Sequence, residues 1–259
     1  MPMSRFLFAT DLHGNVDSYE RLFGMEADAV VLGGDLLPHI KGTLERRLET
    51  QQEFCRGFLS EKFSSRPVYW IAGNDDWAAA LPLLEGKGTA IHGCAAPFLD
   101  GLSIAGYAYV PVTPFGMKDH DRFDSDEWTP RVLPQRCLFS SPAGLESGPL
   151  TSVRLRGTIA ADLERLAALS DPAKTVYVTH SPPWGTSLDR MWNGASVGSR
   201  AIRAFIERHR PPLTLHGHIH ESPGVDRIGP TVSVNPGDSF GRLRAVRVDL
   251  PDLSVTPLR

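Results

Sequence analysis

The chain has 259 residues, a length that predicts one large domain or two small ones. Lysine and arginine number 27 against 30 aspartates and glutamates. The resulting net charge of −3 gives no electrostatic reason to expect a dedicated nucleic-acid binder. Hydrophobic residues make up 41% of the chain and charged residues 22%, which excludes a disordered protein and is typical of a globular one. No apolar run approaches the roughly 18 residues of a membrane-spanning helix.

The three cysteines are widely spaced and include no CxxC pair. We interpret Cys55, Cys94 and Cys137 as buried thiols in a reducing compartment, because a disulfide framework or a zinc site would repeat them at short spacings. The apolar run before Asp11 is too short for the core of a signal peptide. We therefore expect a cytoplasmic protein with no membrane partner.

Short apolar runs alternate with helical stretches along the chain. In chain order we expect a strand over 6–10, a helix over 15–24, a strand over 29–32, a helix over 43–59, a strand over 67–72 and a short helix over 77–84. A strand over 102–110, a helix over 159–169, a strand over 175–179, a helix around 201–206, and strands over 213–215, 231–234 and 244–248 follow. The alternation predicts an α/β layered fold, and no boundary divides residues 1–259 into two domains.

Residues 111–149 interrupt this alternation with proline, serine and charged residues. A stretch of that length without periodicity is usually a functional lid or a disordered segment, so we treat it as a possible lid. We interpret its charged run, residues 118–122, as a solvated loop.

Acidic, amide and imidazole side chains follow five of the predicted strands. They are Asp11 and His13, then Asp35, then Asn74, Asp75 and Asp76, then His180, and finally His216, His218 and His220. Ligands of open α/β sheets bind beyond the carboxyl ends of the strands. We therefore expect these groups to meet at one edge of a sheet, where neighbouring glycines allow tight turns and a close approach of the backbone.

This combination of side chains suits divalent metals. Imidazole with carboxylate favours Mn, Fe, Zn, Co or Ni, and the lack of thiolates disfavours a structural zinc site. Asp11 and His13 can leave the same side of an extended segment, because strand side chains repeat every two residues, and His218 and His220 can do likewise. An aspartate between the two sets could bridge two metals and leave a shared water or hydroxide for in-line attack at phosphorus.

Each motif alone has an ordinary structural explanation. Asp-Leu-His-Gly is usually a capped turn, Gly-Gly-Asp a turn, and Gly-Asn-Asp-Asp a turn into a capped helix. A solitary histidine such as His180 is more often a satisfied interior residue than a ligand. Chance does not readily explain five such motifs in this order, each after a predicted strand.

In this order the motifs resemble the calcineurin-like metallophosphoesterase superfamily, and the match spans residues 11–220. The family pattern corresponds here to Asp11-Leu-His13, Gly34-Asp35, Gly73-Asn74-Asp75-Asp76, His180 and Gly217-His218-Ile219-His220. The segments that begin at His180 and Gly217 further look like a bacterial and archaeal branch of small members. The resemblance implies an α/β fold, a four-layer α/β/β/α sandwich of two mixed sheets flanked by helices, with a dinuclear metal centre.

The resemblance also implies two sets of metal ligands. One metal would be held by Asp11, His13, Asp35 and His220, and the other by Asp35, Asn74, His180 and His218. Asp35 would bridge the pair. A bridging hydroxide would attack phosphorus while the two divalent metals, manganese among them, neutralise the developing charge.

The chain departs from the family pattern at Asp75, where the family has a histidine that contacts the phosphate and assists the leaving group. An aspartate beside two cations should be ionised, which makes it a poor proton donor and repels a phosphate. We therefore expect another donor, a preference for good leaving groups, or slow turnover. Lys118 or His120 is a candidate donor if residues 111–149 fold over the site. Asp76 and Glu221 could orient neighbouring groups.

The leading hypothesis is a metal-dependent phosphoesterase that hydrolyses small phosphodiesters or activated phosphomonoesters. The alternatives are a protein or nucleotide phosphomonoesterase, and a non-catalytic scaffold of the same fold that binds a partner. The scaffold hypothesis predicts missing ligands, whereas suitable residue types occupy all seven ligand positions. A nuclease ranks low because the chain has no basic surplus. Trp184 is interpreted as a packing residue, with stacking on a nucleobase or an aryl group as the alternative.

Overall fold

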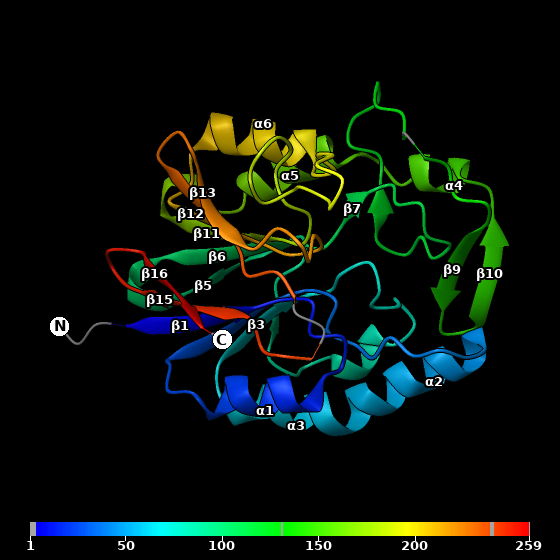
Figure 1. Cartoon of the computed structure of the whole chain (residues 1–259), viewed down its shortest axis with the longest axis horizontal. Coiled ribbons are helices and arrows are strands. Elements are labelled where there is room, and N and C mark those ends of the chain that lie inside the picture. The colour runs from blue at the N-terminus through cyan, green and yellow to red at the C-terminus, as the bar shows by residue number, and fades with distance from the viewer. Residues whose placement is uncertain (1–3, 131, 239–240, 259) are drawn as a thin grey trace.

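The computed structural model describes residues 4–130, 132–238 and 241–258. Within these residues, two six-stranded sheets, A and B, pack face to face, and helices cover the outer face of each (Figure 1). The α/β fold with two mixed sheets and flanking helices is therefore confirmed. In the described part of the chain, no helix combines the length and the apolar character needed to cross a bilayer.

Sheet A has three parallel strands at its centre, β1 (Arg5–Ala9), β2 (Ala29–Gly33) and β3 (Val68–Ile71). Every residue of β2 is buried, as expected for a strand covered on both faces. The strand order is β16-β15-β1-β2-β3-β4. The outer strands are β4 (Thr89–Ala90), parallel to β3, and the antiparallel pair β15 (Ala245–Asp249) and β16 (Ser254–Leu258).

Sheet B has the strand order β13-β14-β12-β11-β6-β5. Its four inner strands are parallel: β6 (Ser103–Tyr107), β11 (Thr175–Thr179), β12 (Leu213–His216) and β14 (Thr231–Asn235). The two edge strands, β5 (Ala95–Pro97) and β13 (Gly224–Ile228), run antiparallel to their neighbours.

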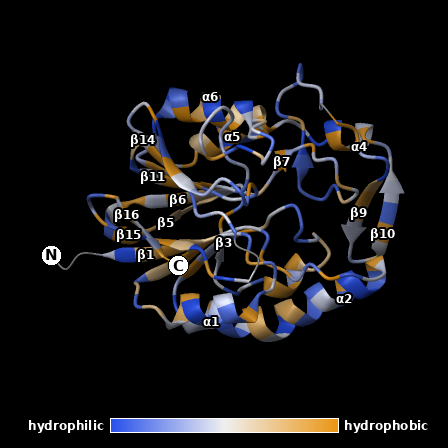
Figure 2. Cartoon of the chain, viewed as in Figure 1, coloured by the Kyte–Doolittle hydropathy of each residue, from blue (hydrophilic) through white to orange (hydrophobic). Residues whose placement is uncertain are grey.

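The helices that cover sheet A are α1 (Val16–Gly24), α2 (Leu44–Phe54) and α3 (Ser60–Ser65), and those that cover sheet B are α5 (Ile159–Ala167) and α6 (Arg200–His209). Asn15 and Thr43 cap α1 and α2, because their side-chain oxygens accept bonds from backbone amides of the first turn. The helix predicted over 43–59 is longer than expected, since α2 continues through a π-helical turn (Cys55–Leu59) into α3. The helices mix hydrophobic and hydrophilic residues, whereas the strands between them are mainly hydrophobic (Figure 2).

Buried side chains fill the three interfaces between these layers. Phe6 and Phe8 lie between the two sheets, Leu22 and Leu59 between sheet A and its helices, and Tyr177 with other residues between sheet B and its helices. These layers hold the carboxyl ends of the inner strands in fixed positions, which is the basis of the site described below.

Residues 111–149 contain regular structure, so the disorder alternative is wrong for the part the structure describes. Short strand β8 (Asp121–Arg122) pairs with β7 (Val110–Pro111), and β9 (Cys137–Ser141) forms a hairpin with β10 (Gly144–Gly148). Helix α4 (Thr151–Arg154) follows, beside the sandwich (Figure 1). Val112, Phe123 and Val153 give this region a small core of its own.

The prediction that residues 118–122 form a solvated loop is also wrong, because all five are buried. The ammonium of Lys118 donates to Asp121 at 2.7 Å and to the Thr113 hydroxyl at 2.9 Å. The guanidinium carbon of Arg122 lies 3.7 Å from the ring centre of Tyr109. Local partners therefore compensate the charges that composition alone suggests are solvated.

Two further expectations are corrected. The helix predicted over 77–84 is reduced to a 3₁₀ turn, Leu81–Leu84, with Pro82 near its start; other 3₁₀ turns span Leu99–Gly101 and Pro172–Lys174. Cys55 and Cys137 are buried as expected, but Cys94 is exposed, and all three are free thiols.

Candidate metal centre

The polar groups singled out above lie at the carboxyl ends of two sheets rather than one. Asp11, Asp35 and Asn74 follow β1, β2 and β3 of sheet A, whereas His180 and His218 follow β11 and β12 of sheet B. The expectation of a single sheet edge is thus corrected. Because the sheets are stacked with these strand ends at the same side, the loops of both converge.

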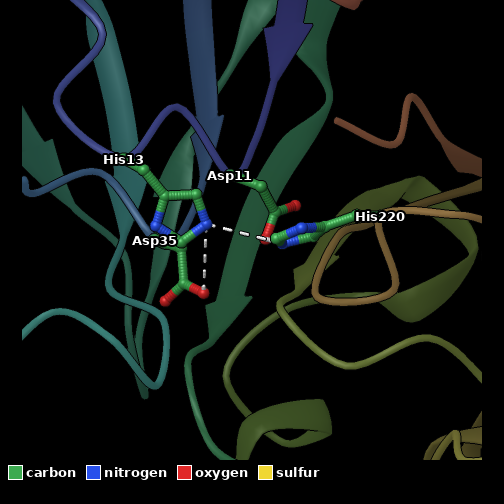
Figure 3. A group of neighbouring side chains, drawn as sticks. All are labelled: Asp11, His13, Asp35 and His220. Carbon is green, nitrogen blue, oxygen red and sulfur yellow. Dashed lines mark hydrogen bonds and ion pairs between the residues drawn. The ribbon is translucent and has the colours of Figure 1, made fainter. Parts of the chain in front are cut away.

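The first group consists of Asp11, His13, Asp35 and His220, whose ligand atoms all lie within 4.8 Å of one another (Figure 3). Nε2 of His220 lies 3.2 Å from a carboxylate oxygen of Asp11 and 3.4 Å from Nε2 of His13. The His13 Nε2 atom is also 4.0 Å from Oδ2 of Asp35. Two carboxylates and two imidazoles therefore point into one small volume, which is a donor set that divalent transition metals accept.

The second group consists of Asp35, His180 and His218, again with ligand atoms within 4.8 Å of one another. Nε2 of His180 lies 3.4 Å from Oδ2 of Asp35 and 3.3 Å from the amide oxygen of Asn74. Nδ1 of His180 is 2.8 Å from the carbonyl of Gly33, so it carries the proton of the neutral ring and leaves the lone pair on Nε2. Asp35 belongs to both groups.

Four residues of these groups have left-handed backbone, with φ of 54° at Asp11, 44° at His13, 52° at Asp35 and 67° at His218. They are four of the seven non-glycine residues with positive φ in the described ranges. Such conformations cost free energy in residues with a Cβ, and they persist where the surrounding structure enforces them. Amide-to-carbonyl bonds between the loops, such as Asp11 to Gly34 at 2.9 Å, hold the strained turns in place.

The two central carboxylates are buried and ionised. Burial alone would raise the pKa of Asp35, but the charges of His180 and His13 and a bond from the Asp75 amide hold it well below its usual range. Burial likewise opposes ionisation of Asp11, and His220 and His180 outweigh it and lower the pKa. Without another cation, the histidines must supply the balancing positive charge.

The histidines respond to these carboxylates according to their contacts. Burial would lower the pKa of His180, yet Asp35 and Asp11 raise it to about 10, and Asp11 raises that of His220 to about 9 against burial. His218 has no such direct ion pair, so burial and the nearby charge of His180 lower its pKa to about 4. A site whose carboxylates recruit protons onto neighbouring imidazoles fits divalent cations, because the cations would replace those protons.

Residues behind the two groups fix the loops. Asp76 is fully buried, and its carboxylate accepts bonds from the amides of Leu36, Leu37 and Gly73 at 2.7 to 3.0 Å. It therefore ties the loop that carries Asp35 to the loop that carries Asn74. Asn235 similarly donates to the carbonyl of Ile219 at 3.0 Å, between the two histidines of the last motif.

Asp75 lies at the open side of the site, beside a histidine that the sequence analysis did not single out. Its Oδ2 is 3.0 Å from Nδ1 of His39 and 4.0 Å from Nδ1 of His13. The guanidinium of Arg47 is 3.2 Å from Nε2 of His39. The bond to Asp75 raises the pKa of His39 above its ordinary value. No local pattern in the sequence marks His39, because it lies in a loop without helical or strand periodicity.

Neither candidate donor from residues 118–122 reaches Asp75. Lys118 is fully buried. Its ammonium donates to Asp121, to the carbonyl and hydroxyl of Thr113 and to the carbonyl of Met117. His120 is buried as well, and burial lowers its pKa to about 4. His39 is the imidazole that occupies the position beside Asp75.

A cavity of about 390 Å³ opens directly over the two groups, and Asp35, Asn74, Asp75, His218 and His220 line its floor. Glu221 and Trp184 also line it, so both of these residues lie at the site rather than elsewhere on the surface. The buried metal-binding groups are accessible to a ligand through this opening.

Comparison with known families agrees with the geometry. A model of the calcineurin-like phosphoesterase family matches residues 4–222 of the chain. The chain belongs to this family. Its strand ends place the motif residues in two groups of side chains that share one aspartate and could each hold a metal ion, the arrangement typical of a dimetal centre in this family.

The chain is also similar to individual proteins, each over a short segment or at low identity. An uncharacterized protein of Methanocaldococcus jannaschii, MJ1162, is 41% identical over 63 residues, which cover 23% of this chain and 29% of that protein. The crystal structure of TT1561 of Thermus thermophilus is 19% identical with a TM-score of 0.61 and covers 99% of both chains. Phosphopantetheinyl hydrolase (PptH) of Mycobacterium tuberculosis is 13% identical with a TM-score of 0.56 over 92% of this chain and 90% of its own. The two solved structures share the fold.

Proposed function

We propose that the protein is a metal-dependent phosphoesterase that hydrolyses phosphodiesters or activated phosphomonoesters. The observation that carries the proposal is the position of Asp35, whose carboxylate belongs to both groups of metal-binding side chains beneath an open cavity. Membership of the calcineurin-like phosphoesterase family supports the same chemistry.

We assign the ligands by motif position and by contact. One metal is assigned to Asp11, His13, Asp35 and His220, and the other to Asp35, Asn74, His180 and His218. The side chains favour Mn, Fe, Zn, Co or Ni. Two such cations would supply the positive charge that activates water and neutralises the phosphate during in-line displacement. The bond from His180 to Gly33 supports its assignment, because it orients Nε2 toward Asp35.

The chain's own residues have separate tasks in this proposal. Asn74 contributes an amide oxygen beside His180, and Asp75 lines the cavity while its carboxylate contacts His39. Asp76 acts as a positioning residue, because its carboxylate is fully buried and is saturated by backbone amides. Through its contact with Asp75, His39 places an imidazole beside Asp75 and His13.

Hydrolysis of two model substrates tests the proposal. Bis-p-nitrophenyl phosphate and p-nitrophenyl phosphate are assayed with added manganese for the wild type, Asp35→Asn and Asp252→Asn. Asp35→Asn preserves an oxygen that can accept the Asp75 amide bond at 2.7 Å, so the fold is retained. Asp252→Asn makes the same chemical change at an exposed position. We expect turnover to fall at least about 100-fold in Asp35→Asn and to equal that of the wild type in Asp252→Asn.

Metal content separates the enzyme from the alternative of a non-catalytic scaffold. After dialysis against manganese, elemental analysis of the wild type should give about two ions per chain, and Asp35→Asn should hold fewer. Bound metal without turnover on either substrate would favour a scaffold or a phosphomonoesterase of narrow specificity. Near-full activity of Asp35→Asn would refute the bridging role of this residue.

A further inference from the structure

The cavity above the metal-binding groups has two apolar walls. One wall comes from residues 111–115 together with Trp128 and Val132, and the other comes from Trp184, Met191 and Val197. Its floor carries the polar residues named above. The cavity therefore joins a site for a phosphate to a space that suits an uncharged group.

Several apolar side chains at this cavity are exposed to solvent. Phe115 has 57% of its surface exposed, Val132 59% and Met191 42%. Trp192 and Leu133, next in the chain to two of these residues, are 86% and 63% exposed. Exposed large hydrophobic residues that gather at the rim of one cavity mark a binding surface for an apolar ligand.

The charges along the cavity disfavour a second anionic group. Among the lining residues that the structure describes, Arg200 is the one lysine or arginine, and its guanidinium carbon lies 3.7 Å from the ring centre of Trp184. Glu221 and Asp75 contribute carboxylates to the same lining. A second phosphate or an acidic peptide would meet these carboxylates, and of the described lining residues only Arg200 carries a guanidinium or ammonium group that could offset them.

Both walls are anchored before any ligand arrives. Asp124, which follows β8, accepts bonds from the Ser199 hydroxyl and from the Arg200 amide at 2.7 Å, and thereby joins residues 111–149 to the start of α6. Asp119 accepts from the amide of Ala78 at 2.9 Å, just beyond Asn74 and Asp75. A wall held in this way loses little conformational entropy on binding.

We propose that this cavity binds the organic group of the substrate, so that the preferred phosphoester carries an uncharged aryl or alkyl group and no second phosphate. The inference rests on the proposed function, since it places the phosphoryl group at the metal-binding residues. Trp184, held from one side by Arg200, provides an aromatic surface for that group. This favours the stacking alternative for Trp184 over simple packing.

Binding of non-hydrolysable phosphonates tests the proposal without any turnover. Methylphosphonate, hexylphosphonate and benzylphosphonate share one anionic head, and each is titrated into the manganese-loaded protein by calorimetry. We expect the hexyl or the benzyl compound to bind at least about tenfold more tightly than the methyl compound, because each buried methylene adds to the affinity. The ratio of the dissociation constants of hexylphosphonate and benzylphosphonate shows whether the cavity prefers an alkyl or an aryl group. Equal dissociation constants for all three would overturn the proposal.

Variants of the walls locate the effect. Phe115→Asp and Met191→Asp place a carboxylate on either wall at exposed positions, where the fold tolerates it. Leu169→Asp is the matched control, since Leu169 is 54% exposed and lies between α5 and β11, at the opposite end of β11 from His180. We expect both wall variants to lose the tenfold preference of the wild type for the hexyl or benzyl compound over methylphosphonate. Unchanged preference in both wall variants would refute the assignment.

Kinetics separate this inference from the proposed function. Methyl p-nitrophenyl phosphate and phenyl p-nitrophenyl phosphate release the same leaving group, so their kcat/KM ratio reports the remaining ester group. A ratio of at least about ten in favour of the phenyl ester, expressed mainly in KM, supports the proposal. Hydrolysis of both esters at equal kcat/KM would keep the phosphoesterase and overturn the apolar pocket. Failure both to bind any phosphonate and to hydrolyse either ester would overturn the apolar pocket and the proposed function together.

Discussion

Asp75 stands where the family pattern has a histidine, and its surroundings change what that substitution means. The carboxylate is paired with His39, whose Nε2 lies 3.2 Å from the Arg47 guanidinium, so these neighbours partly offset its negative charge. The repulsion of an incoming phosphate is therefore smaller than an isolated aspartate would cause. What the pair still lacks is an imidazole at position 75 itself.

Asp75→His should raise turnover of substrates with poor leaving groups. We expect kcat for phenyl phosphate to rise about tenfold, at the low end of what a positioned proton donor contributes, with little change for p-nitrophenyl phosphate. Asp75→Asn removes the charge without adding a proton donor and serves as the control. An equal gain in both variants would attribute the effect to charge, and no gain in either would mean that position 75 lies away from the leaving group.

At the residue scale, the sequence predicted the groups that belong to ordered motifs. Asp11, Asp35 and His180 each follow a strand directly, so their convergence depends only on the strand order. His39 could not be predicted, because it reaches Asp75 across a loop of no recognisable pattern. Lys118 was misjudged for a related reason, since its burial depends on Asp121 and on a turn that only the folded chain creates.

At the scale of elements, the loops after the strands are built to bring side chains together at short range. A Cβ at Gly73 would lie 2.6 Å from Nε2 of His180 and would also collide with the Asp35 carboxylate. The same holds at Gly217, where a Cβ would meet Thr10 and Asp11. Glycine is therefore required at these two positions by the closeness of the ligand atoms rather than by backbone conformation.

Gly73→Ala should disrupt the metal centre while the sheets remain. The added methyl group would push Asp35 and His180 apart, so we expect manganese content to fall below one ion per chain and turnover to fall by at least about 100-fold. Gly24→Ala is the control, because nothing lies within 4 Å of a Cβ there. Far-UV circular dichroism should be the same for both variants. Full metal content in Gly73→Ala would contradict the close packing described here.

The strands that the sequence predicted most accurately are those covered on both faces of their sheet. Strands such as β2 and β11 are continuous apolar runs and were placed within a residue of their bounds. Strands β13 and β16 lie at sheet edges with several exposed or half-buried residues, and the hairpin of β9 and β10 is rich in serine and glycine. Their pairing depends on neighbours far along the chain, which local pattern does not contain.

At the scale of the whole molecule, metal binding should be coupled to stability. The ionised Asp11 and Asp35 are buried at the point where loops of both sheets meet, so cations bound there would stabilise the native state alone. We expect removal of metal with a chelator to lower the Tm of the wild type by several degrees and to change that of Asp35→Asn much less. Calorimetry with and without added manganese measures both. Equal shifts in the two proteins would place the stabilising ions elsewhere.

Acid should destabilise the protein through His92, an exposed histidine whose ring still accepts a part-buried hydrogen bond from the backbone. His92 accepts a bond from the amide of Ala108 at 3.0 Å, and burial, together with the nearby His120 and Arg122, lowers its pKa to about 4. The unfolded chain binds a proton at this residue near pH 6.5, so the unfolded state takes up more protons between pH 6.5 and 4. The contribution of His92 to stability is thus present above pH 6.5 and is lost as the pH falls through that range.

His92→Asn should remove this pH dependence. The variant retains an acceptor for Ala108 but cannot be protonated, so its loss of unfolding free energy between pH 7 and pH 5 should be smaller than that of the wild type, by an amount that solvent screening at this exposed residue reduces. Urea denaturation of the wild type and the variant at the two pH values measures this difference. Other titrating groups, such as Asp121 with a pKa raised by burial to about 6, contribute equally to both proteins and cancel. His39→Asn should act in the opposite direction, because a raised pKa stabilises the folded state as the pH falls. Identical pH dependence in the wild type and His92→Asn would mean that His92 is protonated in the folded protein.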